Sequence, residues 1–586
     1  MTVLRFIASI IILAGVCPRL AAAELTARDL ASPNMAVMFE VNRPVQLSGH
    51  ALARDLWGLL KQTTTVQHAL TTAEFDKFRQ AARFIEKSLG VDWHIGLSKL
   101  TSGGIIFVVQ APQPQREPDV TVVVTASDAP TLTQFMTAVE AEIRRAAGDN
   151  KGPEPEAASY RSYELHRVGN GLYTVAGRQL VVSNTRLGLE AALDRLAGAA
   201  AEKPFDLPSS LRMVDGRGNS PTILATVNLG LFRQDEKASA LLKIPADDPA
   251  PQVLLGGYLD LLRRADFAAV GMFADGSSFD FKVRIPAGSA GAVSSLAGFF
   301  ATDSTESVPP LLKPPGVMFS AAWFRDYKRL WDARGELLNA NFVRQFDAAD
   351  AGARSQPTGF GISDVLHWLG PHFRVVAARQ REQVYPRKVA ERLPAVGLVV
   401  SVRNETAVRD RLLPPVDGLL LIVLNNLIED FKKVDYRDAR ITTFRFSEQA
   451  AGSGPGQAWL MHSNPAFTLT RGQLIIGSTA EIVRDLIDEL DRQQDVAIES
   501  PPLTEHVTDR QQLLLGEVIG YLAAFHERIV RDLARTHGQS SDVAEKEVHL
   551  FSSALERIGR IATSHVIASD HFEMTLTVGL PAGPTD

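Results

Sequence analysis

Cysteine is almost absent from this sequence, because its 586 residues include only Cys17. A single thiol excludes disulfide frameworks, cysteine-ligated zinc sites and iron–sulfur clusters, which all need several cysteines. An excess of positive charge is also missing, since 61 Lys and Arg residues stand against 67 Asp and Glu residues. The resulting net charge of −6 predicts no bulk attraction to nucleic acid or to an anionic membrane surface.

Long apolar runs are missing as well. A membrane-spanning helix needs about 20 apolar residues, and the stretch Leu419 to Leu424 is followed at once by Asn425 and Asn426. We therefore expect a buried helix there and no transmembrane segment after the N-terminus. With 45% hydrophobic residues, the chain can still build real cores. Its length exceeds what one core supports, which predicts two lobes.

Residues 1–23 have the three parts of a signal peptide. Arg5 supplies a minimal basic region, an apolar run extends from Phe6 to Val16, and three alanines ending at Ala23 precede Glu24. This pattern predicts cleavage between Ala23 and Glu24 and export to the periplasm or the extracellular space. An uncleaved anchor or a buried first helix is the alternative.

A lipoprotein signal is a further alternative, because Leu13 to Cys17 is similar to the lipobox of bacterial lipoproteins. Val16 replaces the small residue expected before the cysteine, and Pro18 follows it. Removal of residues 1–23 would leave a cysteine-free chain, which must be held together by packing alone.

The chain aligns with itself without a gap over 13 residues. Tyr173 to Thr185 matches Phe467 to Thr479, and the match resumes at Leu193 to Leu196 and Ile487 to Leu490. Both copies predict a short strand, a turn that contains glycine, a second strand, and a threonine that caps a helix. Further matches occur in the same order, and we infer an internal duplication from them. Val37–Phe39 matches Val317–Phe319, and the predicted strand 120–125 matches 396–401. At the end of each half, a predicted helix leads into two strands. In the first half these are helix 254–264 and strands 268–273 and 278–285, and in the second half helix 554–561 and strands 564–568 and 571–578.

The boundary between the copies is rich in Gly, Ala, Ser and Pro and ends in Lys313-Pro314-Pro315-Gly316. We expect a first lobe over residues 24–290, a semi-rigid linker over 291–315 and a second lobe over 316–586. Strands joined by tight turns favour antiparallel pairing, and the helices between them must cover the sheet. The predicted fold class is α+β, with two similar lobes, each a mainly antiparallel sheet covered by helices.

The sequence also resembles a family of uncharacterised exported bacterial proteins, known only as a domain of unknown function. The resemblance rests on Met38 to Pro44, on Gly103-Gly104-Ile105, and on the hairpin that ends in Gln179 to Asn184 with its following helix. These are packing patterns over most of both lobes. The resemblance implies the fold and the export, and it implies no activity, cofactor or catalytic residue.

Spacings that indicate catalysis or metal binding are absent: there is no His-Glu-x-x-His helix, no Gly-x-Ser-x-Gly turn and no Gly-x-Gly-x-x-Gly after a strand. Three groups of residues are weaker candidates for a site. Ser569-Asp570-His571 holds the residue types of a hydrolase triad, but neighbours on a strand point to opposite faces. Gly370-Pro371 separates His367 from His372 and breaks any helix that would align them on a metal. Arg43 could reach a carboxylate or phosphate, although Ala321 to Trp323, its counterpart by this alignment, lacks an arginine.

No catalytic, cofactor-binding or metal-ligating residue is therefore predicted. The leading hypothesis is an exported, non-catalytic binding or structural protein of the bacterial cell envelope, whose partner is an envelope protein or a ligand of unknown identity. The alternative is an envelope hydrolase with carboxylates far apart in sequence. A chaperone that uses an apolar helix over Leu513 to Phe525 is a third possibility.

Overall fold

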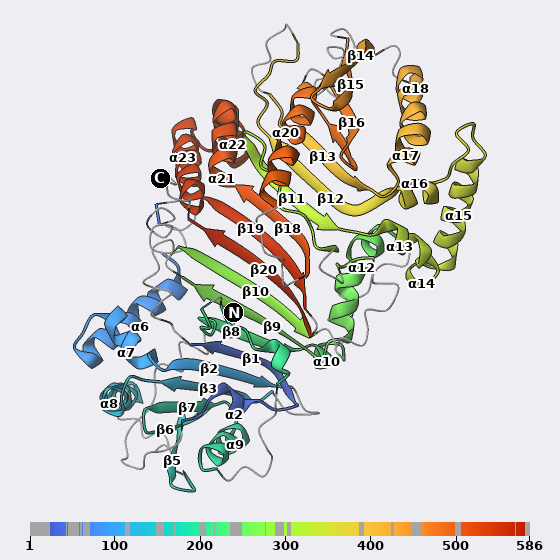
Figure 1. Cartoon of the computed structure of the whole chain (residues 1–586). Helices are drawn as coiled ribbons and strands as arrows, with labels where there is room; N and C mark the ends of the chain where they lie inside the picture. The colour runs from blue at the N-terminus through green and yellow to red at the C-terminus, as the bar shows by residue number, and fades with distance from the viewer. Residues whose placement is uncertain are drawn as a thin grey trace. The chain divides into compact units, whose positions relative to one another are not determined.

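The computed structural model divides the chain into two compact units (Figure 1). Unit 1 consists of residues 1–241 and 263–286, and unit 2 of residues 242–262 and 287–586. Both units combine antiparallel strands with helices, which confirms the predicted α+β class. The structure describes residues 24–42, 44, 58, 61–62, 71–111, 118–147, 158–168, 171–198, 207–215, 217–234, 239, 249–275, 277–286, 298–301, 306–385, 392–423, 427–447, 460, 462–497, 506–568 and 570–580.

Unit 1 contains an antiparallel sheet in the order β5-β6-β7-β3-β2-β1-β8-β9-β10, and β4 pairs with β5. The central strands are rich in Val, Ile and Phe, which suit a pleated and half-buried surface. The strands are β1 (Met35–Val41), β2 (Gly104–Gln110), β3 (Val120–Thr125), β4 (Ala158–Tyr160), β5 (Tyr163–Val168), β6 (Gly171–Ala176), β7 (Gln179–Ser183), β8 (Ile223–Asn228), β9 (Phe267–Ala274) and β10 (Ser278–Pro286).

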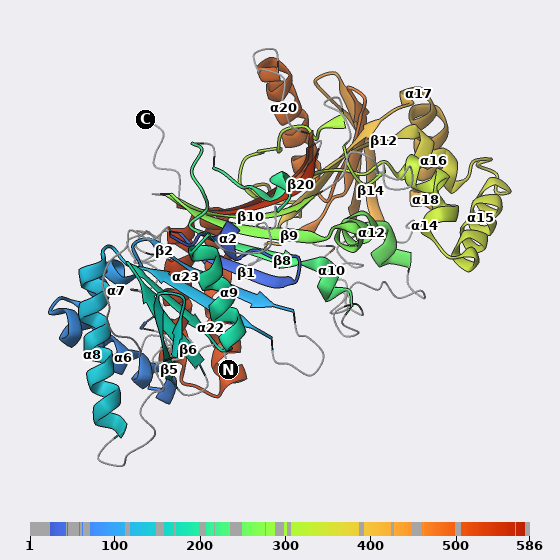
Figure 2. The same ribbon diagram turned by 90° about the horizontal axis from the view of Figure 1, so that it is seen from below.

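Helices cover both faces of this sheet, and side chains that alternate along a strand meet different helices. Val123 and Val181 pack into a core with α9 and α2, whereas Val124 and Leu180 face a core built by α6, α7 and α8. In Figure 2, α8 and α9 accordingly lie on either side of the strands. The helices are α2 (Ala27–Leu30), α6 (Ala73–Leu89), α7 (Trp93–Thr101), α8 (Ala129–Ala147), α9 (Arg186–Leu196) and α10 (Leu229–Phe232), with a short 3₁₀ turn η1 (Ser209–Leu211).

Unit 2 contains an antiparallel sheet in the order β14-β15-β16-β17-β13-β12-β11-β18-β19-β20. Its strands are β11 (Val317–Phe324), β12 (Leu369–Ala378), β13 (Ala395–Val402), β14 (Ile428–Tyr436), β15 (Ala439–Phe446), β16 (Ala466–Thr470), β17 (Gln473–Gly477), β18 (His506–Leu514), β19 (Arg560–Ile567) and β20 (His571–Gly579). Its helices are α12 (Pro249–Arg264, of which residues 249–262 belong to this unit), α13 (Tyr327–Asp332), α14 (Arg334–Leu337), α15 (Ala340–Arg354), α16 (Ile362–Trp368), α17 (Glu405–Ala407), η4 (Val408–Leu412), α18 (Leu413–Val423), α20 (Ala480–Ala497), α21 (Leu515–Leu522), η6 (Ala523–Phe525), α22 (His526–His537) and α23 (Ser541–Ile558).

The two units share the order of their strand pairs and also the register within those pairs. In unit 1, Thr125 of β3 pairs with Gln179 of β7. In unit 2, Ser401 of β13 pairs with Gln473 of β17. Residues 179 and 473 are the positions that the sequence alignment matched. The shared pairing is what the predicted duplication requires, and the duplication itself stays a prediction.

The registers change one of the sequence matches by two residues. Val37 pairs with Val109 after a bulge in β1, and Phe319 pairs with Ala377 after a bulge in β11. Val37 therefore corresponds to Phe319, and not to Val317 as the sequence match has it. The face of each residue is preserved, because side chains repeat every second residue in a strand. Arg43 lies outside the described residues, so the prediction that unit 2 lacks a matching arginine stays a prediction.

The described residues of the segment predicted as a linker over 291–315 belong to unit 2 and pack into it. Phe299, Ala301, Val308 and Leu312 are all buried. Proline-rich composition indicated an extended chain, and the apolar residues between the prolines make that chain part of a core. Helix α18 was expected to be buried, but Ile422 is 77% exposed. No helix in the part of the chain that the structure describes is long and apolar enough to cross a membrane.

Candidate functional site

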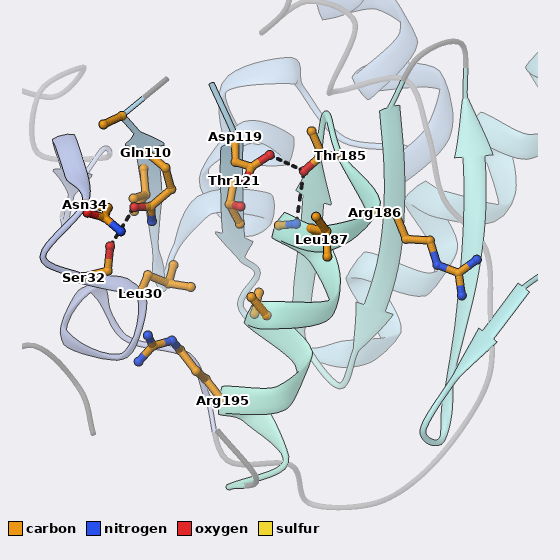
Figure 3. Close-up of a pocket in the computed structure, with 15 residues that line it drawn as sticks. Leu30, Ser32, Asn34, Gln110, Asp119, Thr121, Thr185, Arg186, Leu187 and Arg195 are labelled. Carbon is orange, nitrogen blue, oxygen red and sulfur yellow. Dashed lines mark hydrogen bonds between the residues drawn. The ribbon is translucent and has the colours of Figure 1, made fainter. Parts of the chain in front are cut away.

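A pocket of about 670 Å³ lies on the α9 face of the unit 1 sheet (Figure 3). Three segments form it: the connection between α2 and β1, the neighbouring ends of β2 and β3, and α9. We call it the Arg195 pocket. Its described lining consists of Leu30, Ser32, Asn34, Val108, Gln110, Ala111, Asp119, Thr121, Thr185, Arg186, Leu187, Gly188, Ala191, Ala192 and Arg195.

The first turn of α9 forms one wall of the pocket. Thr185 caps the helix, because its hydroxyl oxygen accepts the Gly188 backbone N–H at 3.1 Å. The same hydroxyl donates to Asp119 Oδ1 at 2.6 Å (Figure 3). Since the hydroxyl joins Asp119 to α9, the only carboxylate among the described lining residues is already engaged by the protein.

The opposite wall is also held by hydrogen bonds within the protein. Ser32 Oγ donates to Gln110 Oε1 at 2.7 Å, as Figure 3 shows, and the Asn34 carbonyl accepts the Ala111 N–H at 2.7 Å. These contacts fix the α2–β1 connection to the end of β2. The pocket is therefore a built feature of the fold with hydrogen-bonding groups on two walls.

Arg195 lies in the last turn of α9 and lines the pocket. Its Nη1 atom is buried and has no hydrogen-bond partner among the described residues. Figure 3 shows the guanidinium reaching from α9 toward the segment that carries Leu30 and Ser32. A buried donor without an acceptor costs about 1 to 3 kcal/mol, and more when the group is charged. An anionic or carbonyl oxygen of a ligand would remove that cost.

Helices α9 and α20 differ in side-chain volume at two matched positions. In the matched hairpin and helix, Gly188 corresponds to Ile482 and Ala192 corresponds to Leu486. Ile482 and Leu486 are fully buried in the core of unit 2, where they pack against Gly397. In unit 1 the space beside Gly188 is taken by side chains of the sheet, because a Cβ there would meet Ser183 Oγ at 2.5 Å and Thr121 Oγ1 at 3.3 Å.

Arg195 itself corresponds to Glu489 of unit 2, which is satisfied by its own unit. Glu489 is buried, and Oε1 accepts the Lys313 N–H at 3.0 Å and Gln493 Nε2 at 2.9 Å. Arg492 forms an ion pair with the same carboxylate. The same position is thus internally paired in unit 2 and carries an unpaired cation in unit 1.

A second group of polar residues lies buried in unit 2. Arg325 Nη1 lies 3.3 Å from Asp509 Oδ1, and Arg325 Nη2 donates to the Tyr258 hydroxyl at 3.0 Å. Tyr258 in turn donates to Asp509 Oδ2 at 2.7 Å, and His565 Nδ1 lies 3.3 Å from that oxygen. Burial first, and the charge of Asp509 second, raise the pKa of Tyr258 above its ordinary value of 10.

This buried network satisfies itself. Arg325 Nη1 also donates to the carbonyl oxygens of Phe299 at 3.0 Å and Phe324 at 2.5 Å. The Tyr258 ring packs edge-on against Phe300 and Phe572. The network therefore ties α12 and the proline-rich segment to the sheet of unit 2, and it has the character of a structural element.

The candidates from the sequence do not converge on a site. His367 Nδ1 lies 2.6 Å from the Ser363 carbonyl oxygen and His372 Nε2 lies 2.9 Å from that of Glu306, so each ring has its own main-chain partner. Burial lowers the pKa of His372. His571 Nδ1 lies 2.6 Å from Asp570 at the start of β20.

Two candidates and one side of the predicted cleavage site lie outside the described residues, namely Arg43, Ser569 and Ala23. Glu24 is described, and its Oε2 accepts Arg178 Nη2 at 2.7 Å. This hydrogen bond lowers the pKa of Glu24. The described residues contain no group of three or more His, Cys, Asp or Glu side chains placed to hold a metal ion.

Sequence reasoning missed the residues that define the Arg195 pocket. No motif marks Asp119, Thr121 or Arg195, because they come from segments far apart in the chain. One signal was present in the alignment of the two copies: Gly188 stands against Ile482, and Arg195 against Glu489. These two differences mark a helix face whose side-chain volume and charge differ between the two matched segments.

Comparisons with known proteins do not assign this chain to a family. No family model matches the chain, and no curated protein matches it. One solved structure, described as crystal form III of TP0453, matches at 9% identity with a TM-score of 0.23. The match covers 45% of this chain and 80% of that chain, and a likeness at this level carries no argument about fold or function.

Proposed function

We propose that this chain is an exported, non-catalytic binding protein of the bacterial cell envelope. In this proposal the Arg195 pocket holds a small ligand whose anionic group, a carboxylate or a phosphate, pairs with Arg195. The hydrogen-bonding side chains of the α2–β1 connection and of β2 orient the rest of the ligand. The segment 1–23 supports export by its signal-peptide pattern.

The observation that carries the proposal is the buried and unpaired Nη1 of Arg195. Arginine presents a planar fork of donors that matches carboxylate and phosphate oxygens. The volume of about 670 Å³ lies within the range of small-molecule sites, about 300 to 1,000 Å³. Glu489 at the corresponding position in unit 2 has its partners within the protein, so the unpaired cation is particular to unit 1.

The lining favours binding over the alternative of a hydrolase. Hydrolysis by carboxylates uses an acid and a base that flank the scissile bond. The described lining of the pocket has one carboxylate, Asp119, and Thr185 already donates to it. Arg186, the other basic residue of the described lining, pairs with Glu190 at 2.7 Å. This set of groups can hold an anion, and it offers no pair of groups for acid and base catalysis.

Thermal unfolding in the presence of anions tests the proposal. The purified protein is heated in inorganic phosphate, glycerol 3-phosphate or succinate, each compared with chloride at equal ionic strength. Ligand at ten times its dissociation constant stabilises the folded state by about 1.4 kcal/mol, which raises the melting temperature by a few degrees. Stabilisation by the phosphates alone would identify a phosphate site, and stabilisation by succinate alone would identify a carboxylate site.

Two matched variants locate the effect. Arg195→Gln should abolish the stabilisation by anions, and Arg217→Gln, which changes an exposed arginine outside the pocket, should leave it intact. Equal stabilisation in all three proteins would contradict the proposal, because the anion would then act elsewhere.

Export is tested separately. The full-length chain is expressed in a bacterium and fractionated, and the N-terminus of the exported protein is sequenced. Cleavage after Ala23, with Glu24 as the first residue, is the expected result. Recovery of the intact N-terminus from the cytoplasm would contradict export and would leave the binding test untouched.

A further inference from the structure

The sheet of unit 1 has a second cavity, on the face opposite the Arg195 pocket. It has a volume of about 510 Å³ and lies between the sheet and helices α6, α7 and α8. Thr121 lines the Arg195 pocket, whereas Val122 and Val124 line this cavity, as alternation along β3 requires. We call it the apolar cavity. Its described lining consists of Val37, Phe39, Val41, Ile85, Leu97, Leu100, Thr101, Ile105, Phe107, Val122, Val124, Leu132, Phe135 and Leu180.

The lining has no charged side chain and a single polar one, among the residues that the structure describes. That residue, Thr101, donates its hydroxyl to the Leu97 carbonyl at 2.8 Å within α7. The lining thus presents no unsatisfied donor or acceptor that would hold water or orient a polar ligand. Such walls favour apolar molecules over polar ones, because a polar group placed there would lose its hydrogen bonds with water.

The volume of the cavity suits a ligand larger than one benzene ring. An engineered apolar cavity of about 150 Å³ binds benzene, and the apolar cavity is more than three times as large. Each Å² of apolar lining that a ligand covers contributes about 25 cal/mol to binding.

The cavity is wide and opens to solvent at one strand. Its floor runs across β1, β2, β3 and β7, which are neighbours in that order. Three strand spacings of about 4.8 Å make the floor roughly 14 Å wide. Phe39 lines the cavity and is 37% exposed, so solvent reaches the lining at β1.

We propose that the apolar cavity binds the aliphatic chain of a lipid-like molecule, with the polar head of that molecule outside the cavity at β1. The site does not depend on the proposed anion site, because it lies on the other face of the sheet. Each methylene that enters the cavity should strengthen binding about fourfold, until the cavity is full.

Straight-chain alcohols of 6 to 12 carbons, and the carboxylates of equal length, are the probes. Titration calorimetry with purified protein should show affinity that rises about fourfold per methylene and then levels off. Alcohol and carboxylate of one length should bind within a few-fold of each other, because the head is not held in the cavity.

Two aromatic residues of unit 2 suggest a variant that should fill the apolar cavity. Val41 corresponds to Trp323 and Ile105 to Phe373, and those two rings stack at 5.9 Å. Val41→Trp with Ile105→Phe should fill the cavity and weaken binding of the longest chain at least tenfold. Val270→Phe adds an aromatic ring to β9 of the same sheet outside the cavity, and should leave the affinity unchanged. Ile105→Phe alone serves if the double variant does not fold.

Three results would overturn the proposal. The first is affinity that does not change with chain length. The second is a filled variant that binds as well as the wild type. The third is binding of carboxylates without alcohols, lost in Arg195→Gln, which would assign the probes to the Arg195 pocket. Conversely, an intact chain-length series in Arg195→Gln would separate this site from the anion site even if the anion proposal fails.

Discussion

Units 1 and 2 pair their strands in the same order, but they fill the space around their sheets differently. On the α20 face of unit 2, Ile482 and Leu486 pack against Gly397 in a buried core. On the α9 face of unit 1, Gly188, Ala192 and Thr121 line the Arg195 pocket. The strand order is common to both units, and the side chains between the helix and the sheet differ.

The two units also differ in the charged residues that lie in register across their central strands. In unit 1, Glu40 of β1 is in register with Ile106 and Leu224. In unit 2, the corresponding Ala322 is in register with Arg374 and Arg510. Burial raises the pKa of Glu40 to about 7 and lowers the pKa of Arg374 to about 10. The charge of this row therefore lies on β1 in unit 1 and on β12 and β18, the two neighbours of β11, in unit 2.

The arginines of the two units give the largest expected difference. Arg325→Met should reduce the free energy of unfolding of unit 2 by about 3 to 5 kcal/mol, because it leaves Asp509 buried without its cation. Arg195→Met removes a buried donor that has no partner at Nη1, and should raise the free energy of unfolding by about 1 to 3 kcal/mol. Urea unfolding measures both. Equal losses would show that Arg195 is held by the protein and would undermine the proposed site.

The two helix faces give the next largest difference. Leu486→Ala removes a fully buried side chain from α20 and should cost about 2 to 5 kcal/mol. Ala192→Leu, the reverse change in α9, should cost much less if it fills the Arg195 pocket, and it should abolish anion binding. Urea unfolding and thermal shift in phosphate test the pair. A similar loss of stability from both changes would contradict the assignment of an open pocket.

Glu40 makes the stability of unit 1 depend on pH. Its pKa is about 7 when folded, against about 4.3 in an unfolded chain, so the folded state binds the proton more tightly. Stability should therefore fall as pH rises from about 4.3 to 7 and stay lower above that. Glu40→Gln should remove the fall, and stabilise the protein by up to roughly 3 kcal/mol at pH 8 with little effect at pH 4. Unfolding curves that differ equally at both pH values would contradict this origin.

The helix caps give the smallest difference. Thr185 Oγ1 accepts the Gly188 N–H at 3.1 Å, and Thr479 Oγ1 accepts the Ile482 N–H at 3.2 Å. Thr479→Ala should cost about 1 kcal/mol. Thr185→Ala should cost somewhat more, because Thr185 also donates to Asp119. A smaller loss for Thr185→Ala would show that the contact with Asp119 adds nothing to stability.

Much of the fold could be predicted because it depends on local patterns. The strand over 120–125 is observed at the predicted residues, and the strand over 268–273 extends by one residue at each end. The predicted C-terminal end of the helix over 554–561 was wrong. Gly559, with φ of 67°, ends α23, and β-branched Ile561 then lies in β19.

The candidate sites could not be predicted in the same way. Asp119 and Thr185 are 66 residues apart and meet only because β3 pairs with β7. The apolar cavity is a space between residues from four strands and three helices, and each of those residues alone reads as core. Sequence periodicity shows which face of the sheet a residue occupies. It does not show whether the helices packed on that face fill the space above the residue.

The crystal structure of the protein grown in inorganic phosphate would test the central claim most directly. The account predicts an anion in the Arg195 pocket, with one oxygen about 2.7 to 3.0 Å from Arg195 Nη1. It also predicts that the corresponding region of unit 2 stays closed around Ile482 and Leu486. A structure in which Arg195 Nη1 donates to a main-chain carbonyl of the protein, with no anion in the pocket, would contradict the account.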